Sequence, residues 1–156
     1  TLLVRSHPLG AGDYAPPFAT DRVRPLGSDL VSDVTPALPA FDALITDYSS
    51  LLFDSALVPL PVVFLAPDLA DYAARRGFYG TYADVAGPDH AVHWSGATAQ
   101  LIDVLRSDGE RRRRIDRAIA VSRGVHAHRD GGNTRRVYRA ILAGLAEDAR
   151  RTKGSR

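Results

Sequence analysis

The amino-acid sequence predicts an α/β protein built on a Rossmann-like parallel sheet with helices on both faces. Short runs that are almost entirely apolar, typical of strands buried on both sides, alternate with segments of helical spacing. The clearest run is PVVFLAP at residues 61–67. Strands that alternate with helices are joined by crossover connections, which make neighbouring strands parallel.

The individual elements follow from these patterns and from the residues that interrupt them. Pro8 and Gly10 end the first strand, and Pro59 closes a helix. Residues 68–84 are predicted to be mostly loop, and an Asp-Gly-Gly-Asn break at 130–133 caps the last helix. The expected strands cover residues 2–5, 22–26, 41–45 and 61–67, and the expected helical segments cover 32–41 (weakly, with two prolines), 49–58, 97–106, 109–123 and 134–148.

Composition sets the broad class of the protein. The chain has 156 residues, 45% hydrophobic and 24% charged, which fits one globular domain with a core. Cysteine is absent, which excludes disulfides, thiolate metal sites and a cysteine nucleophile. No apolar stretch approaches the roughly 18 residues of a membrane span, so we expect a soluble domain. Because it lacks methionine and opens on TLLV, we expect a piece of a longer protein.

Positive charge gathers late in the chain. The net charge is only +2, but arginines cluster at residues 111–114, at 135–139 and in a tail at 150–156. We expect the run 111–114 on the outer face of its helix and the tail to be disordered. Solvated helix faces explain such clusters, and contact with an anionic membrane or a phosphate-rich polymer is the alternative.

Polar residues follow three of the expected strands at their carboxyl ends, where ligands bind in open parallel sheets. These stretches are Arg5-Ser6-His7, TDYSS at 46–50, and Asp68 onward. A helix N-terminus presents unsatisfied N–H groups and partial positive charge, and serine hydroxyls add donors, so residues 46–50 suit a phosphate. A simple helix cap at Asp47 or Ser49, worth about 1 kcal/mol, is the competing interpretation.

His7 and Arg76 are the other candidates for chemistry. An imidazole at a sheet edge can act as a base or stabilise a phosphate, although an ordinary loop histidine has the same signature. Arg76 precedes Gly77, so a guanidinium suited to phosphate lies beside backbone that permits close approach; a surface arginine is the alternative. The remaining histidines lack metal-site spacing and no Walker loop is present, so neither a metal nor another cofactor is expected.

In combination, these stretches resemble the C-terminal half of the CDP-glycerol glycerophosphotransferase family, the bacterial teichoic acid polymerases and primases. The most specific feature is TDYSS at 46–50 followed by Phe53-Asp54, with Arg-Gly-x-Tyr at 76–79 downstream. The similarity covers nearly the whole chain up to about residue 148. It also includes VRSHP at 4–8, DALI at 42–45, PVVF at 61–64, PDL at 67–69, Tyr72, Gly87-Pro88 and Asp130-Gly131.

The resemblance implies a two-domain GT-B enzyme. It would transfer glycerol phosphate, or a related polyol phosphate, from CDP-glycerol to a hydroxyl of a teichoic-acid-like cell-wall polymer and release CMP. Residues 1–128 would form the donor-binding domain, residues 129–149 a helix packed on this domain or on the missing half, and residues 150–156 a tail. Because the family's acceptor site and second histidine lie in the missing half, the isolated chain is expected to be inactive. The enzyme is expected in the cytoplasm, peripheral at the inner face of the cell membrane.

The same resemblance implies roles for individual residues. His7 matches a catalytic histidine near the transferring phosphate. The serines would hold the diphosphate, Arg76 would neutralise it, and Asp68 would contact the cytidine or ribose. The full set of implied donor-binding residues is Arg5, Thr46, Asp47, Ser49, Ser50, Asp68 and Arg76.

Two other interpretations stay open. One is a GT-B glycosyltransferase of capsule synthesis that uses a CMP- or UDP-activated sugar, because the pocket chemistry would be similar. The other is a non-catalytic α/β module whose serines only cap a helix and whose basic face docks a partner or membrane. No nucleic-acid partner is suggested by either.

Overall fold

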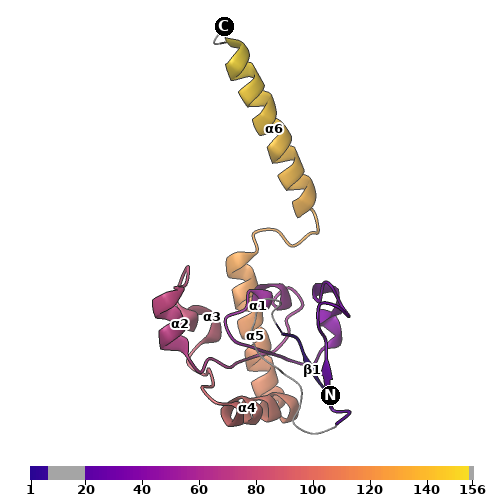
Figure 1. Cartoon of the computed structure of the whole chain (residues 1–156), viewed down its shortest axis with the longest axis vertical. Coiled ribbons are helices and arrows are strands. Elements are labelled where there is room, and N and C mark those ends of the chain that lie inside the picture. The colour runs from indigo at the N-terminus through magenta and orange to yellow at the C-terminus, as the bar shows by residue number, and fades with distance from the viewer. Residues whose placement is uncertain (7–19, 155–156) are drawn as a thin grey trace.

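Figure 1 shows the computed structural model, which describes residues 1–6 and 20–154. His7 lies outside the described residues. The chain forms an α/β body from which one long C-terminal helix projects (Figure 1). The elements are strands β1 (Leu2–Val4), β2 (Val23–Pro25), β3 (Leu44–Thr46) and β4 (Val62–Phe64), the 3-10 helix η1 (Thr35–Ala40), and helices α1 (Leu51–Ser55), α2 (Leu69–Arg75), α3 (Tyr82–Ala86), α4 (Trp94–Arg106), α5 (Asp108–Val125) and α6 (Asn133–Gly154).

The strands pair in parallel, as the sequence predicts, and this confirms the α/β class. β1 pairs with β2, and β3 pairs with β4 with Ile45 opposite Val63. In the described part of the chain these are two separate pairs and not the single continuous sheet that we expected. A parallel bridge between Leu65 and Ala91 adds a backbone contact beyond β4.

The segment predicted as loop, residues 68–84, contains two helices. α2 follows Asp68, and α3 begins after Thr81, whose amide donates to the Asp84 carboxylate at 3.0 Å. α2 buries none of its residues and α3 has only five, so neither segment shows an apolar period of 3.6 residues. The prediction of a loop was therefore wrong, because very short helices carry almost no periodic signal.

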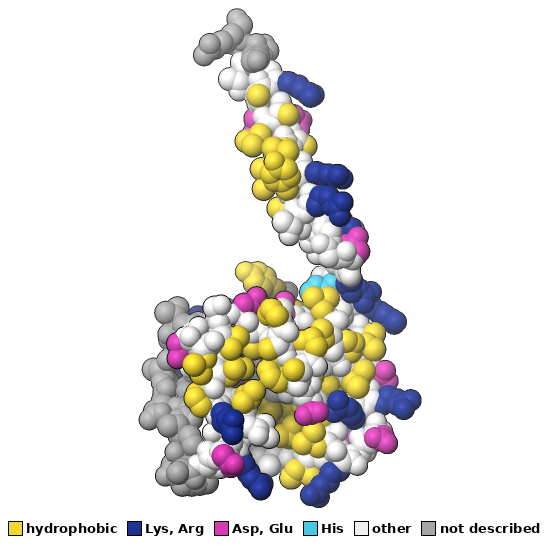
Figure 2. All heavy atoms as spheres, turned by 90° about the vertical axis from the view of Figure 1, so that its right-hand side faces the viewer, with side chains coloured by type: hydrophobic (Ala, Val, Ile, Leu, Met, Phe, Trp, Pro, Cys, Tyr) yellow, Lys and Arg dark blue, Asp and Glu magenta, His cyan; other side chains and the backbone are white. Residues whose placement is uncertain are grey.

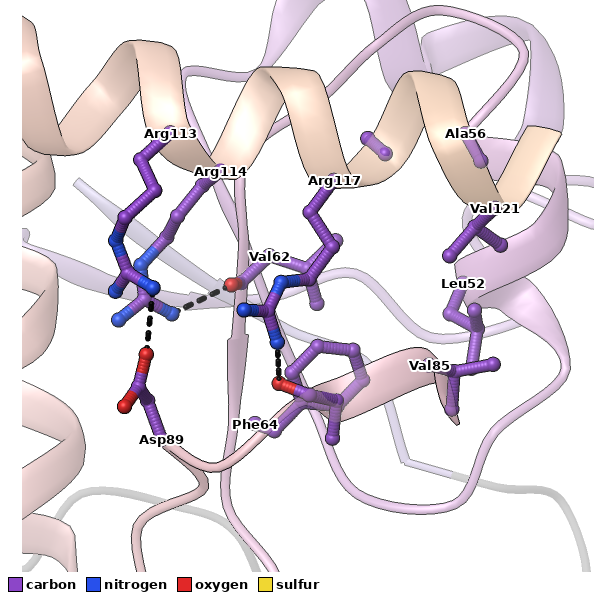
Figure 3. Close-up of a pocket in the computed structure, with 12 residues that line it drawn as sticks. Leu52, Ala56, Val62, Phe64, Val85, Asp89, Arg113, Arg114, Arg117 and Val121 are labelled. Carbon is purple, nitrogen blue, oxygen red and sulfur yellow. Dashed lines mark hydrogen bonds and ion pairs between the residues drawn. The ribbon is translucent and has the colours of Figure 1, made fainter. Parts of the chain in front are cut away.

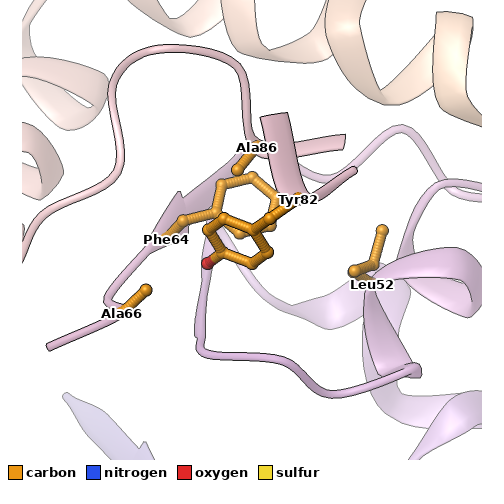
Figure 4. Packing of buried hydrophobic residues seen from close by; sticks show 5 residues of the cluster. All are labelled: Leu52, Phe64, Ala66, Tyr82 and Ala86. Atoms are coloured by element: carbon orange, nitrogen blue, oxygen red, sulfur yellow. The ribbon is translucent and has the colours of Figure 1, made fainter. Parts of the chain in front are cut away.

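The core lies on both sides of the β3–β4 pair. Successive residues of a strand point to opposite faces, so Val63 and Phe64 of β4 reach different layers. Val63 is fully buried in a cluster with Ala97 and Val104 of α4. Phe64 packs in a second cluster that Figure 4 shows, with its ring against Tyr82 at 5.9 Å. β4 is thus buried on both faces, which is why its sequence is continuously apolar.

Arg114 joins three elements from inside the body. It is only 6% exposed, although we expected residues 111–114 on the outer face of their helix. Its guanidinium pairs with Glu110 of α5 at 2.7 Å and donates to the Gln100 amide oxygen of α4 at 3.0 Å. It also donates to the Val62 carbonyl of β4 at 2.8 Å. The expectation fails because the helical period turns one member of the run inward.

Arg117, one turn further along α5, explains why residue 87 is a glycine. Its guanidinium donates to the carbonyl oxygen of Ala86. Gly87 has φ +67°, a conformation that favours glycine, and a Cβ at this position would overlap the Arg117 guanidinium. Any side chain here would displace the arginine that ties α5 to the end of α3.

α6 is longer than the helix predicted at 134–148 and includes residues 150–154, which we expected to belong to a disordered tail. The chain turns into α6 at Asp130, whose carboxylate accepts from the Gly132 amide at 3.0 Å and pairs with Arg136 at 2.5 Å. Hydrogen bonds from Arg136 and Gly132 hold the pKa of Asp130 below its ordinary value. None of the described helices combines the length and apolar character that crossing a membrane requires.

We expect the substitution Glu110→Gln to destabilise the body in a pH-dependent way. Hydrogen bonds from Arg113 and Arg114 lower the pKa of Glu110 from 4.5 to about 2. Ionised Glu110 therefore stabilises the fold above the unfolded-state pKa, and this stabilisation is lost as the pH falls from 4.5 towards 2. Urea unfolding should show a loss of about 1–3 kcal/mol at about pH 7 and a smaller loss at about pH 2.5.

The exposed Glu147–Arg151 pair of α6 offers a matched control. Glu147→Gln should change the free energy of unfolding by less than about 0.5 kcal/mol at either pH. A Glu110→Gln effect that stays constant across this pH range would contradict the role given to the carboxylate.

Candidate functional site

Two of the three polar stretches meet at the carboxyl edge of the β3–β4 pair. Residues 46–50 join β3 to α1, and Asp68 follows β4. The hydroxyl of Tyr48 donates to the Asp68 carboxylate at 2.8 Å, which joins the two strand ends directly. The parallel pairing therefore brings together the stretches that the sequence places 20 residues apart.

An aromatic cluster of Tyr48, Tyr72, Phe78 and Tyr82 supports this edge. The rings of Tyr48 and Tyr72 stack with centroids 3.9 Å apart, and Phe78 lies 5.4 Å from Tyr72. Tyr82 meets Tyr48 edge to face at 5.5 Å, and its hydroxyl donates to the Asp47 carbonyl at 3.1 Å. The sequence analysis did not predict that these rings pack together. The four aromatic residues within 72–82 were the available signal, because so many aromatic side chains in a short segment indicate packing against another part of the protein.

The two serines are exposed, and one of them also has a local structural role. The Ser49 hydroxyl accepts from the Leu51 amide at 3.2 Å, and the Ser49 carbonyl accepts from Leu52 at 3.3 Å. Ser49 therefore satisfies one free amide at the start of α1, although the N-cap itself is Ser50 and not Asp47 or Ser49 as the competing interpretation expects. A hydroxyl that accepts an amide proton keeps its own proton to donate, so this cap is compatible with anion binding by Ser49 and Ser50.

Thr46 and Asp47 lie at the same edge, Thr46 half-buried and Asp47 exposed. Thr46 is the half-buried last residue of β3, and its carbonyl accepts from the Leu65 amide at 2.9 Å. Asp47 is exposed while its carbonyl holds Tyr82. The backbone of both residues is thus fixed, which leaves the side chain of Asp47 at the surface.

Arg76 is held near the edge by its neighbours in sequence. It ends α2, and its amide donates to the Tyr72 carbonyl at 2.8 Å. Gly77 then takes φ +71°, and the chain returns to place Phe78 against Tyr72. Because Tyr72 and Phe78 both pack in the aromatic cluster, the exposed Arg76 between them stays close to it.

Arg5 has a structural role that the sequence did not reveal. Its guanidinium donates to the carbonyls of Leu26, Val31 and Ser32 at 3.0, 2.7 and 3.2 Å. In Figure 1 the β1 strand that precedes it lies on the opposite side of the body from α2 and α3. The structure therefore does not bring Arg5 together with the β3–β4 edge, and its assignment to donor binding stays a prediction, as does that of His7.

The tyrosines at this edge act as donors and not as bases. Burial, together with the hydrogen bond to Asp68, raises the pKa of Tyr48 well above its ordinary value. Burial, and to a lesser degree the charge of Asp47, raises the pKa of Tyr82 in the same direction. Both phenols thus stay protonated at neutral pH and keep their hydrogen bonds.

A narrow hollow, partly open to solvent, lies between α5 and the elements packed against it (Figure 3). The residues that line it are mainly apolar, and each of its three arginine side chains has a partner in the protein. Arg113 pairs with Asp89 at 2.6 Å, Arg114 with Glu110, and Arg117 donates to Ala86. A phosphate entering here would have to break these contacts, so the hollow is a weaker candidate for a phosphate site than the β3–β4 edge.

No cluster of three or more potential metal ligands occurs among the described residues. The side chains at the β3–β4 edge provide hydroxyls, carboxylates and a guanidinium, from Ser49, Ser50, Asp47, Asp68 and Arg76. This combination suits a ligand that carries both phosphate and hydroxyl groups.

Comparison with known proteins decides the family. The sequence model of the CDP-glycerol:poly(glycerophosphate) glycerophosphotransferases matches residues 1–143. The chain belongs to this family. The match spans both strand pairs and the β3–β4 edge, and it confirms the resemblance drawn from the TDYSS and Arg-Gly-x-Tyr motifs.

Several curated relatives of this glycerophosphotransferase chain act in teichoic acid synthesis, according to their names. The teichoic acid ribitol-phosphate primase of Bacillus spizizenii is 34% identical over 129 residues, 78% of this chain and 31% of the relative. The teichoic acid glycerol-phosphate primase of Bacillus subtilis is 30% identical over 54% of this chain and 21% of the relative. The chain thus spans about a third or less of these relatives. No solved structure matches it significantly.

We expect Tyr48→Phe to weaken the link between the two strand ends in this family member. The substitution keeps the stacked ring and removes the hydroxyl that donates to Asp68, so the free energy of unfolding should fall by about 1–2 kcal/mol in urea titrations. Tyr138→Phe on the exposed α6 is the matched control and should change it by less than about 0.5 kcal/mol. Equal effects of the two substitutions would show that the Tyr48–Asp68 bond does not hold the edge together.

Proposed function

We propose that this chain is the donor-binding half of a GT-B transferase that moves glycerol phosphate, or a related polyol phosphate, from a CDP-activated donor to a hydroxyl of a teichoic-acid-like polymer. The observation that carries the proposal is the junction of residues 46–50 with Asp68 at one sheet edge, through the 2.8 Å bond from Tyr48. Membership of the glycerophosphotransferase family supports the reaction class.

The proposed place of the diphosphate is at Ser49 and Ser50. Both residues are exposed and lie directly before α1, and their hydroxyls can donate to phosphate oxygens. Arg76 would supply the positive charge, since the return of the chain at Gly77 keeps it beside the aromatic cluster. Charge-assisted hydrogen bonds of this kind are roughly twice as strong as neutral ones.

The proposed place of the ribose is at Asp68. One oxygen of its carboxylate accepts from Tyr48, which leaves the other to accept from a ribose hydroxyl. The carboxylates of Asp47 and Asp68 would repel phosphate, so they suit the hydroxyl-bearing part of the donor. Asp68 would thus hold the neutral ribose while Ser49 and Ser50 hold the anionic diphosphate.

The transfer step itself would need the missing half. The oxygen of an acceptor hydroxyl would attack the phosphorus that carries the polyol. A new P–O bond would form, the P–O bond to CMP would break, and the hydroxyl proton would pass to a base or to solvent. His7 is our candidate for the base or for stabilising the developing charge. The guanidinium of Arg5, two residues before His7 in the sequence, donates to three carbonyls and so anchors the end of β1.

The proposed site of action is the cytoplasmic face of the cell membrane, where the polymer acceptor would be bound mainly by the other half. The chain alone should therefore bind donor without turnover. Donor binding can therefore be tested with this chain alone, separately from the transfer reaction.

Calorimetry with CDP-glycerol, CDP-ribitol, CMP and UDP-glucose tests the donor. We expect both CDP-polyols to bind, CMP to bind more weakly, and the double substitution Ser49→Ala with Ser50→Ala to weaken CDP-polyol binding by at least about 10-fold, because two hydroxyl contacts to a charged group are lost. Ser95→Ala, at an exposed serine of α4, is the matched control and should bind as the unchanged chain does.

Two outcomes would contradict the proposal. Binding of UDP-glucose in preference to the CDP-polyols would favour sugar transfer. CDP-polyol binding that is unchanged by the double serine substitution, with only the small loss of stability that a missing cap causes, would place the donor elsewhere.

A further inference from the structure

Phe78 is the most exposed ring of the aromatic cluster. Its centroid lies between 5.4 and 6.0 Å from those of Tyr48, Tyr72 and Tyr82, so three neighbouring rings hold it in place. Phe78 is nevertheless 37% exposed, whereas Tyr82 is only 7% exposed and the other two are half-buried. A ring that is held by its neighbours and still reaches solvent offers a flat apolar surface on which another ring can stack.

Tyr79 adds a second aromatic side chain directly after Phe78. It is fully exposed, so its ring packs against no other part of the described chain. Gly77 makes the turn that brings Phe78 back against Tyr72, with φ +71°. A Cβ at Gly77 would meet no atom within 4 Å, so the glycine serves the turn and the space beside it is open. The ring of Tyr79 therefore adds nothing to the packing of the body and is available to a ligand.

The aromatic cluster adjoins the place proposed for the ribose. The ring of Tyr48 stacks on Tyr72 inside the cluster, while its hydroxyl donates to the Asp68 carboxylate at 2.8 Å. In a nucleotide, the base is attached to the same sugar whose hydroxyls would donate to Asp68. A ribose at Asp68 thus brings its base within reach of the cluster, where the exposed rings are Phe78 and its neighbour Tyr79.

We propose that the pyrimidine base of the nucleotide donor stacks on Phe78, with Tyr79 as a second aromatic contact. This inference rests on the proposed function, because it adds a place for the base to those of the diphosphate and the ribose. Stacking on an aromatic side chain accepts any base, since every base has a π-face. The two rings therefore supply affinity for a nucleotide and do not select cytosine over uracil.

The surroundings of the two rings favour a nucleotide over a protein partner. A stable protein interface takes about 20–30 residues on each side, and the exposed aromatic surface consists of two side chains. Arg76 precedes the pair in sequence, and the Asp68 carboxylate is joined to the cluster through Tyr48. A guanidinium suits the phosphates of a nucleotide and a carboxylate suits its hydroxyls, so the polar groups complement the other two parts of the same ligand.

Calorimetry with CDP on the whole chain tests the proposal. We expect Tyr79→Ala and Phe78→Leu each to lower the affinity for CDP by at least about 5-fold, because a stacking contact is lost. Tyr79→Phe keeps the ring and should bind as the unchanged chain does. Tyr138→Ala is the matched control and should have no effect, because Tyr138 is exposed on α6, which projects away from the body (Figure 2).

Proton NMR of the bound nucleotide gives a readout that a purely structural role of the rings would not move. Protons that lie over an aromatic ring are shielded, so the cytosine H5 and H6 resonances of CDP should shift upfield when it binds the unchanged chain. The shift should be smaller with Tyr79→Ala at saturating CDP. Because Tyr79 is fully exposed, this variant should stay folded even if Phe78→Leu disturbs the packing of the cluster.

Two results would overturn the proposal. One is an affinity for CDP that Tyr79→Ala leaves unchanged, and the other is binding without an upfield shift of the cytosine protons. If CDP binding in either case still depends on Ser49 and Ser50, the place of the base is wrong and the proposed function stands. A chain that binds no CDP at all would contradict both.

Discussion

One buried guanidinium, that of Arg114, ties α5 and α4 to β4, the strand that carries one side of the candidate binding edge. Arg114 is 6% exposed, and burying a charge to this degree costs several kcal/mol unless its hydrogen-bonding groups have partners. Here the partners come from α5, α4 and β4, namely Glu110, Gln100 and the Val62 carbonyl. Fixing β4 also fixes β3 through their shared register, and with it the polar residues at both strand ends.

Some charged residues of the body hold the fold together, and others are exposed at the β3–β4 edge. The arginines of α5 are used inside the molecule, where Arg113 and Arg117 also have protein partners. The β3–β4 edge instead presents exposed hydroxyls and carboxylates on backbone that packs against the aromatic cluster and accepts a hydrogen bond from Tyr82. Backbone that is already held by such contacts needs little further ordering when a ligand binds.

The sequence was sufficient for the parallel strands, because β4 must be apolar on both faces, and for α5, because it is long. It was insufficient for α2 and α3, which are too short to show a period, and for the inward turn of Arg114, which depends on Glu110 and Gln100 lying nearby in the fold. At the site, residues 46–50 and Asp68 were predictable from strand ends. The roles of Tyr48 and Arg5 were not, since a hydroxyl contact 20 residues away and three carbonyl contacts leave no pattern in the chain.

The central claim is that the ligand binds at the β3–β4 edge and not in the hollow beneath α5. The most direct test is a titration of CDP into the isotope-labelled chain, followed by the backbone amide resonances in solution NMR. We expect the largest shifts on residues 46–50, Asp68 and 76–79. Shifts that instead centre on Val85, Arg117 and Val121, which line the hollow, would contradict it.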